Sequence, residues 1–192
     1  MLMVFWNNRP IFFLMCLIFF NSVYANEYET RVKQVETMLQ NDEYVLAADL
    51  DYHFSEQATE ALKNGVPLFW NIKIKVKKRR NFWFDKTEEK HEIRYRLQYH
   101  ALLKMYRVRN ENTHIVSNFS TLTAALDGMA TIRNLPVIQK SKLSPNALYL
   151  VDIKINFEDS ELPLPLQTQV ILNSQWQLSS NWTQWTLSNE TH

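Results

Sequence analysis

Strict alternation of apolar and polar side chains is the feature that most constrains the fold of this chain. Three stretches, residues 70–76, 93–105 and 149–157, carry an apolar side chain at every second position, and residues 44–52 repeat the pattern. Side chains two apart lie on the same face of a β-strand, so this spacing predicts strands with one buried and one solvated face. Such strands are typical of antiparallel sheets.

Two short helices are predicted between these strands. Ser55 can cap the first, and Gly65 ends it after an apolar face within residues 58–62. The second begins at residues 118–120 and ends around residues 134–136. Because no strand-helix-strand repeat is present, the expected fold is mainly β, an antiparallel β-sandwich or a partly rolled sheet with two short helices.

Three other segments fit the alternation less well. Residues 26–41 carry apolar side chains at helical spacing from Val32 to Leu39, which predicts a short amphipathic helix or a frayed arm. The alternation changes phase near Met105, which we interpret as a bulge or bend in one long strand. Two prolines confine residues 162–166 to a sheet edge or an extended connection.

Residues 1–25 have the three parts of a secretory signal peptide. Arg9 supplies a positive charge, residues 11–20 form an apolar run, and small residues precede a cleavage site after Ala25. The run is shorter than the roughly 20 residues that cross a bilayer, so we expect cleavage; retention as an anchor is the alternative. The mature chain is then a single β-rich domain, residues 26–192, that is exported to the periplasm, either free there or peripheral to a membrane.

Cleavage also removes the one cysteine and balances the charge. Cys16 lies inside the apolar run and lacks the small preceding residues of a lipid-modified cysteine. A mature chain without thiols excludes disulfides, thiolate metal sites and cysteine nucleophiles. Loss of Arg9 leaves 20 of the 21 Lys and Arg against 20 Asp and Glu, and a neutral domain of this kind predicts no nucleic-acid partner.

A basic cluster runs directly into an aromatic triplet near the middle of the chain. The residues are Lys73, Lys75, Lys77, Lys78, Arg79, Arg80, Phe82, Trp83 and Phe84. Arg94 and Arg96 add to this charge if the two neighbouring strands form a hairpin. Basic and aromatic side chains together are typical of surfaces that dock on a membrane interface or on a protein. The alternatives are that the lysines keep the sheet soluble and that the rings fold back over the core.

One face of the strand at residues 44–53 carries a candidate metal site. Three ligand side chains lie two residues apart there, Asp49, Asp51 and His53. Ligands on a straight strand converge poorly, so a solvated sheet face is the preferred interpretation, and Glu92, Glu111 or His114 would have to approach to close a site. We expect no cofactor.

Several segments together resemble a known family. They are residues 48–68, 70–77, 95–102, 119–125, 162–166, Trp176, residues 178–180 and residues 182–185. This combination spans nearly all of the mature chain and resembles the exported proteobacterial proteins grouped as domain of unknown function 4390. The resemblance implies a bacterial envelope protein that is encoded beside a sensor histidine kinase of the nitrogen-regulation type and its response regulator. It implies no catalytic residues.

The sequence therefore favours a non-enzymatic envelope module that docks on a membrane protein, such as a sensor kinase, or on lipid head groups. No serine elbow, HExxH motif or glycine-rich phosphate loop points to catalysis. A small-ligand or metal-binding periplasmic domain is the alternative, and a hydrolase without a recognisable motif is a third hypothesis.

Overall fold

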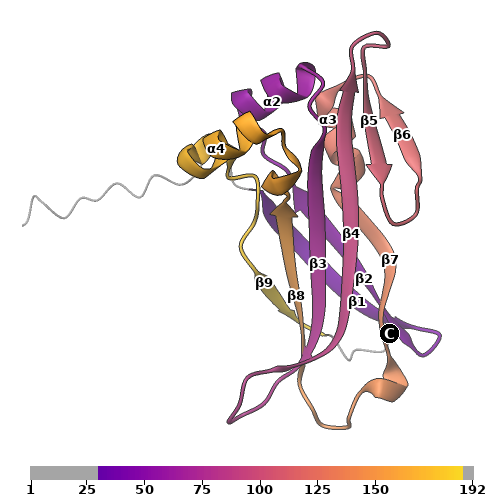
Figure 1. Ribbon diagram of the computed structural model, residues 1–192. Helices are drawn as coiled ribbons and strands as arrows, with labels where there is room; N and C mark the ends of the chain where they lie inside the picture. The colour runs from indigo at the N-terminus through magenta and orange to yellow at the C-terminus, as the bar shows by residue number, and fades with distance from the viewer. Residues whose placement is uncertain (1–29, 188–192) are drawn as a thin grey trace, which may run out of the picture.

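The structure, a computed structural model, describes residues 30–187. The predicted signal peptide, residues 1–25, lies outside this range. Of the described residues, 49% lie in strands and 21% in helices. The strands form two antiparallel sheets (Figure 1). The predicted mainly β, two-layered fold is confirmed.

The larger sheet has six strands in the order β6-β5-β4-β3-β8-β9. Its three longest members are the strands that alternation predicts, β3 (Leu68–Lys78), β4 (Lys86–His100) and β8 (Tyr149–Phe157). The shorter members are β5 (Met105–Asn110), β6 (Val116–Phe119) and β9 (Thr183–Thr186). The smaller sheet, in the order β1-β2-β7, contains β1 (Arg31–Gln40), β2 (Glu43–Asp51) and β7 (Thr131–Gln139) and crosses behind the long strands (Figure 1).

The core lies between the two sheets and is built from the alternate residues that define the strands. Trp70 of β3 is fully buried, with its ring centroid 5.2 Å from Phe157 of β8 and 5.9 Å from Tyr52, which follows β2. Burial of one large apolar side chain contributes about 1.5 to 3 kcal/mol, and an aromatic pair adds about 0.5 to 1.5 kcal/mol. The same residues that specify the strands therefore hold the sheets together.

The three α-helices of residues 30–187 lie toward one end of the long strands. Helices α2 (Glu56–Lys63) and α4 (Leu164–Leu172) lie together there, and α3 (Leu122–Met129) packs beside β5 and β6 (Figure 1). The predicted cap of α2 is confirmed, because Ser55 Oγ accepts a hydrogen bond from the Ala58 amide at 3.1 Å. Gly65 follows with a φ of 86°, a conformation that favours glycine. Single 3₁₀ turns complete the connections, η2 (Lys140–Lys142), η3 (Asp159–Glu161) and η4 (Ser174–Trp176).

The helix or frayed arm predicted within residues 26–41 is wrong, because residues 31–40 form strand β1. Its pairing with β2 shifts between Val32 and Gln34, which marks a β-bulge. The bulge brings Val32 and Val35, three residues apart, to the partly buried face. A bulged strand thus reproduces the apolar spacing of a helix.

The single long strand predicted across residues 93–105 is also wrong. The chain reverses at residues 101–104, and β5 returns antiparallel to β4 with Met105 opposite His100. Lys104 has a φ of 50°, as tight turns often require. The change of phase at Met105 is real, but a hairpin causes it.

Both proline-containing segments also differ from expectation. Residues 162–166 lead into helix α4, with Pro163 as its N-cap and Pro165 in its first turn, where proline lacks only an N–H that would have no intrahelical partner. Helix α3 begins after the cap Thr121 and ends at Met129, well before Pro136, which belongs to β7. The helix ends there because the residues that follow form β7, in which Ile132 and Ile138 are buried and pair with β2.

Candidate functional site

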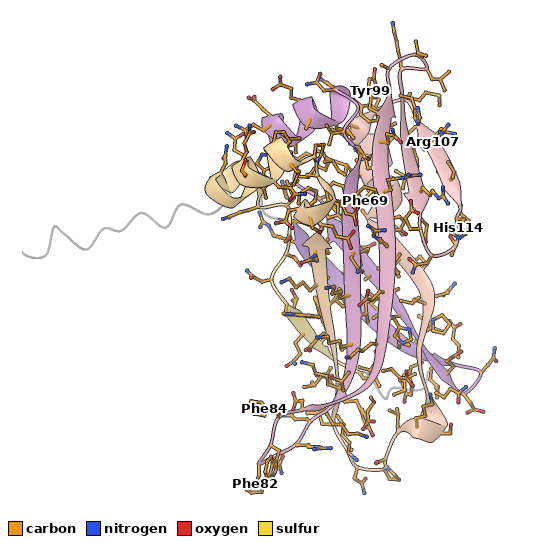
Figure 2. The ribbon with its side chains drawn as sticks, in the orientation of Figure 1. Phe69, Phe82, Phe84, Tyr99, Arg107 and His114 are labelled. Atoms are coloured by element: carbon orange, nitrogen blue, oxygen red, sulfur yellow. The ribbon has the colours of Figure 1, made fainter. Side chains whose placement is uncertain are left out.

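The predicted docking residues lie on the β3–β4 hairpin. The two strands pair from Leu68 opposite Leu97 to Lys78 opposite Lys86, which confirms the predicted hairpin. Residues 79–85, named the tip here, join the strands and project from the end of the molecule opposite α2 and α4 (Figure 2).

The three aromatic side chains of the tip are turned toward solvent. Phe82 is 93% exposed, Trp83 79% and Phe84 96%. Of the two predicted alternatives, the one in which these rings fold back over the core is wrong. Contiguous apolar exposure of this kind is uncommon on a protein surface.

The base of the tip is fixed by hydrogen bonds to a neighbouring loop. The Arg79 amide donates to the Leu148 carbonyl at 2.9 Å, and Lys78 Nζ donates to Ser144 Oγ at 2.8 Å. Between the tip and this loop lies an open recess of about 620 Å³. It is lined by Arg79, Arg80, Asn81, Phe82, Trp83, Asn146, Ala147 and Leu148.

Two lysines on the solvated face of β3 have contacts that the sequence does not predict. Lys77 forms an ion pair with Asp152 of β8, and Lys75 Nζ lies 4.2 Å from the centre of the Trp182 ring. Lys73 lies opposite Glu92 on one side and Lys154 on the other. Lys75 likewise has Asp152 on one side and Lys90 on the other, so opposite and like charges alternate on this face. The predicted basic cluster therefore divides into the lysines of β3, of which Lys77 is ion-paired and Lys78 is hydrogen-bonded to Ser144, and an exposed pair, Arg79 and Arg80, in the tip.

Arg94 and Arg96 do not extend the basic cluster. They lie opposite Asn71 and Phe69, at the far end of the hairpin from the tip. Arg94 donates to Glu158 at 2.7 Å and to Glu161 at 2.9 Å, and the hydrogen bond to Glu158 is the main reason why the pKa of its guanidinium is raised.

A shared carboxylate holds the next arginines of this face. Arg96 Nε lies 3.2 Å from Glu111, which also approaches Arg109 at 3.7 Å. These arginines stabilise the sheet face through ion pairs, and they leave the tip as the main exposed basic surface of the hairpin.

The candidate metal ligands on β2 are held by cations instead. Asp49 accepts from Arg133 Nη2 at 2.6 Å, and Asp51 lies 3.2 Å from Lys33 Nζ and 3.3 Å from His53 Nε2. Burial alone would raise the pKa of Asp51, but the hydrogen bond from Lys33 and the nearby positive charges of His53 and Lys33 lower it. Within residues 30–187, no three His, Cys, Asp or Glu side chains are grouped to hold a metal ion.

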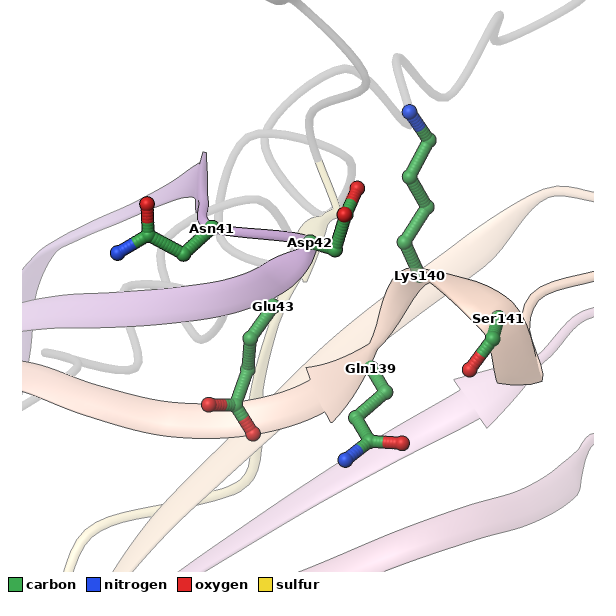
Figure 3. A pocket seen from close by; sticks show the side chains of 6 residues that line it. All are labelled: Asn41, Asp42, Glu43, Gln139, Lys140 and Ser141. Carbon is green, nitrogen blue, oxygen red and sulfur yellow. The ribbon is translucent and has the colours of Figure 1, made fainter.

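A second recess, of about 470 Å³, lies where the β1–β2 turn meets the end of β7 (Figure 3). The residues that line it are Asn41, Asp42, Glu43, Gln139, Lys140 and Ser141. Their side chains spread in several directions and do not converge on one point, as those of a ligand site do (Figure 3). This recess therefore resembles an open surface between loops.

The sequence did not predict the residues that support the hairpin from distant parts of the chain. Asp152, Glu158 and Trp182 lie 64 to 107 positions along the chain from the groups they contact, so no local pattern connects them. A register argument could have found Asp152, because alternation places it on the solvated face of β8 beside β3.

Comparison with known proteins identifies the family. A family model described as domain of unknown function (DUF4390) matches residues 27–186. No curated protein and no solved structure matches the chain. None of the helices in the described range is both long and apolar enough to cross a membrane. Since the matched segment covers most of the sequence and includes both sheets, the chain belongs to the DUF4390 family.

Proposed function

We propose that this chain is a non-enzymatic docking module of the cell envelope and that the tip is its docking surface. The observation that carries the proposal is the exposure of three consecutive aromatic side chains, Phe82, Trp83 and Phe84. Exposed aromatic rings lower the solubility of a free protein, and their burial against another surface is strongly favourable.

The way in which the tip is attached to the sheet supports the same proposal. Strand β3 is paired on both sides, with β4 and with β8, as far as Lys78, and the Arg79 amide continues the contact with the chain that precedes β8. A loop that stands on a fixed base loses less conformational entropy when it binds than a loop on a mobile base. The hairpin therefore presents its rings in a prepared position.

The remaining elements of the proposal are export and the partner. Residues 1–25 direct the chain out of the cytoplasm in this proposal, which leaves the mature domain at the membrane or free beside it. A membrane sensor kinase is the protein partner that the family resemblance suggests.

A photo-cross-linking experiment in native cells tests the proposal. A photoreactive amino acid replaces Trp83 in one strain and Leu102 in the other; Leu102 is 100% exposed on the β4–β5 turn at the opposite end of the hairpin. We expect position 83 to yield adducts with an envelope protein or lipid, while position 102 yields few. Equal labelling from both positions, or none from position 83, would show that the tip is not the docking surface.

A further inference from the structure

We infer that the surface on which the tip docks is an anionic lipid bilayer, into whose interface Phe82, Trp83 and Phe84 insert; this inference rests on the proposed function. The area available at the tip is the first argument. An aromatic side chain buries about 150 to 250 Å², so three rings fall short of the roughly 800 Å² that a standard protein interface buries on each partner. A bilayer requires no matching partner surface.

The chemistry of the rings is the second argument. Tryptophan is enriched where membranes meet water, because its ring is apolar and its N–H reaches the polar layer, and phenylalanine gains from leaving water for the acyl boundary. The tip places one Trp between two Phe, all of them exposed, on a narrow loop at one end of the molecule (Figure 2).

Charge is the third argument, and it selects the kind of lipid. Residues 78–86 contain four cationic side chains and one carboxylate, Asp85; because Lys86 is paired with Glu88 at 2.6 Å, an excess of two positive charges remains beside the rings. Arg79 and Arg80 are exposed, and the ion pairs between described residues include neither of them. Long basic side chains beside an inserted ring reach the head-group layer, where anionic lipids attract them.

Flotation of the purified chain with lipid vesicles tests the inference. The vesicles contain phosphatidylethanolamine and phosphatidylglycerol in one series and phosphatidylcholine alone in the other. We expect binding to the anionic vesicles that weakens in high salt, since exposed charges are screened. The triple variant F82S/W83S/F84S should bind at least about tenfold more weakly, because it loses the apolar insertion.

The charge variant separates the two contributions. Substitution R79Q/R80Q should weaken binding to anionic vesicles by roughly tenfold to thirtyfold, at about fivefold for each cation near the surface, and should not change binding to neutral vesicles. The matched controls are L102S/L103S, which removes exposed apolar residues at the opposite end of β4, and K63Q/K90Q, which removes exposed charge away from the tip. Both controls should bind as the unmodified chain does. Every variant keeps the same N-terminal residues, so a difference between them is due to the changed positions.

Two outcomes distinguish failure of this inference from failure of the proposed function. If the unmodified chain ignores anionic vesicles while position 83 still forms adducts with one protein in cells, the lipid inference is wrong and the docking function stands. If vesicles are ignored and position 83 forms no adducts, both are wrong. Equal flotation of the unmodified chain and F82S/W83S/F84S also overturns the lipid inference.

Discussion

Two buried tyrosines show how the surroundings of a single hydroxyl set its contribution to stability. The Tyr52 hydroxyl lies in the core and has no hydrogen-bond partner among residues 30–187, and burial is the main reason why its pKa is raised. The hydroxyl of Tyr149, also buried, accepts a hydrogen bond from the Ser144 amide at 2.9 Å. An unpartnered buried hydroxyl costs free energy, whereas a bonded one contributes it.

The same change at these two positions should therefore have opposite effects. We expect Tyr52→Phe to raise the free energy of unfolding by about 1 kcal/mol and Tyr149→Phe to lower it by about 1 kcal/mol. Urea unfolding followed by circular dichroism measures both values. A loss of stability in Tyr52→Phe would mean that its hydroxyl has a partner in solution.

The Asp51 carboxylate makes stability depend on pH in the acid range. Its pKa is lowered below the ordinary value of 3.8, so the folded state favours the charged form more than the unfolded state does. The contribution is thus present above the unfolded pKa and is lost as the pH falls through the folded pKa. It stays below about 1 kcal/mol, because Lys33 is largely exposed and water screens the pair.

Substitution Asp51→Asn should remove that pH dependence. We expect the variant to be less stable than the unmodified chain at pH 6, with a smaller difference at pH 2.5, as measured by urea unfolding at both values. The control is Glu60→Gln at an exposed position of α2. If the stability difference for Asp51→Asn were the same at both pH values, the ion pair with Lys33 would not be its cause.

At the scale of elements, the β3–β4 hairpin separates the fold from the docking surface. The strands hold the core, whereas the rings of the tip are exposed and contribute little to folding. Lys78 and Lys86 lie directly opposite each other at the end of the ladder, so a two-residue turn can connect them.

Replacement of residues 79–85 by Asn-Gly tests this separation. We expect the shortened hairpin to fold with unchanged circular dichroism and to be as stable as the original or up to about 1 kcal/mol more stable, because a shorter loop costs less entropy. The same protein should lose vesicle binding. A chain that failed to fold would show that the tip has a structural role.

The elements that the sequence predicts well are those whose signal is local and regular. Strands β2, β3 and β8 and the second half of β4 follow from period-two alternation, and α2 follows from Ser55 and Gly65. Strand β1 was missed because its bulge reproduces helical spacing, and α4 because its prolines lie in the first turn, the one part of a helix that tolerates them.

The residues of the candidate site also fall into two groups, those that a local pattern predicts and those that it does not. The residues of the tip are consecutive, so the sequence alone identifies the cluster of Arg79, Arg80 and Phe82 to Phe84. Pairing of Lys77 with Asp152 and of Arg94 with Glu158 depends on which strands become neighbours, which only the folded sheet order shows. The exposure of the rings likewise follows from how far the hairpin extends beyond the core.

At the scale of the whole molecule, the long sheet separates two different ends. The helices α2 and α4 lie at one end, and the aromatic tip lies at the other (Figure 1). A molecule held at its tip keeps the helical end and both solvated sheet faces away from the surface to which it binds. We therefore expect the molecule to bind through the tip alone and not through a broad face of a sheet.

Fractionation of native cells tests whether the tip holds the molecule at its binding surface. The unmodified chain, F82S/W83S/F84S and the control L102S/L103S are produced at equal levels, and each is measured in the membrane and soluble fractions after the cells are opened. The account predicts that the unmodified chain and the control remain with the membranes, while F82S/W83S/F84S moves to the soluble fraction with an unchanged melting temperature. Equal distribution of all three proteins would contradict the assignment of the tip as the docking surface.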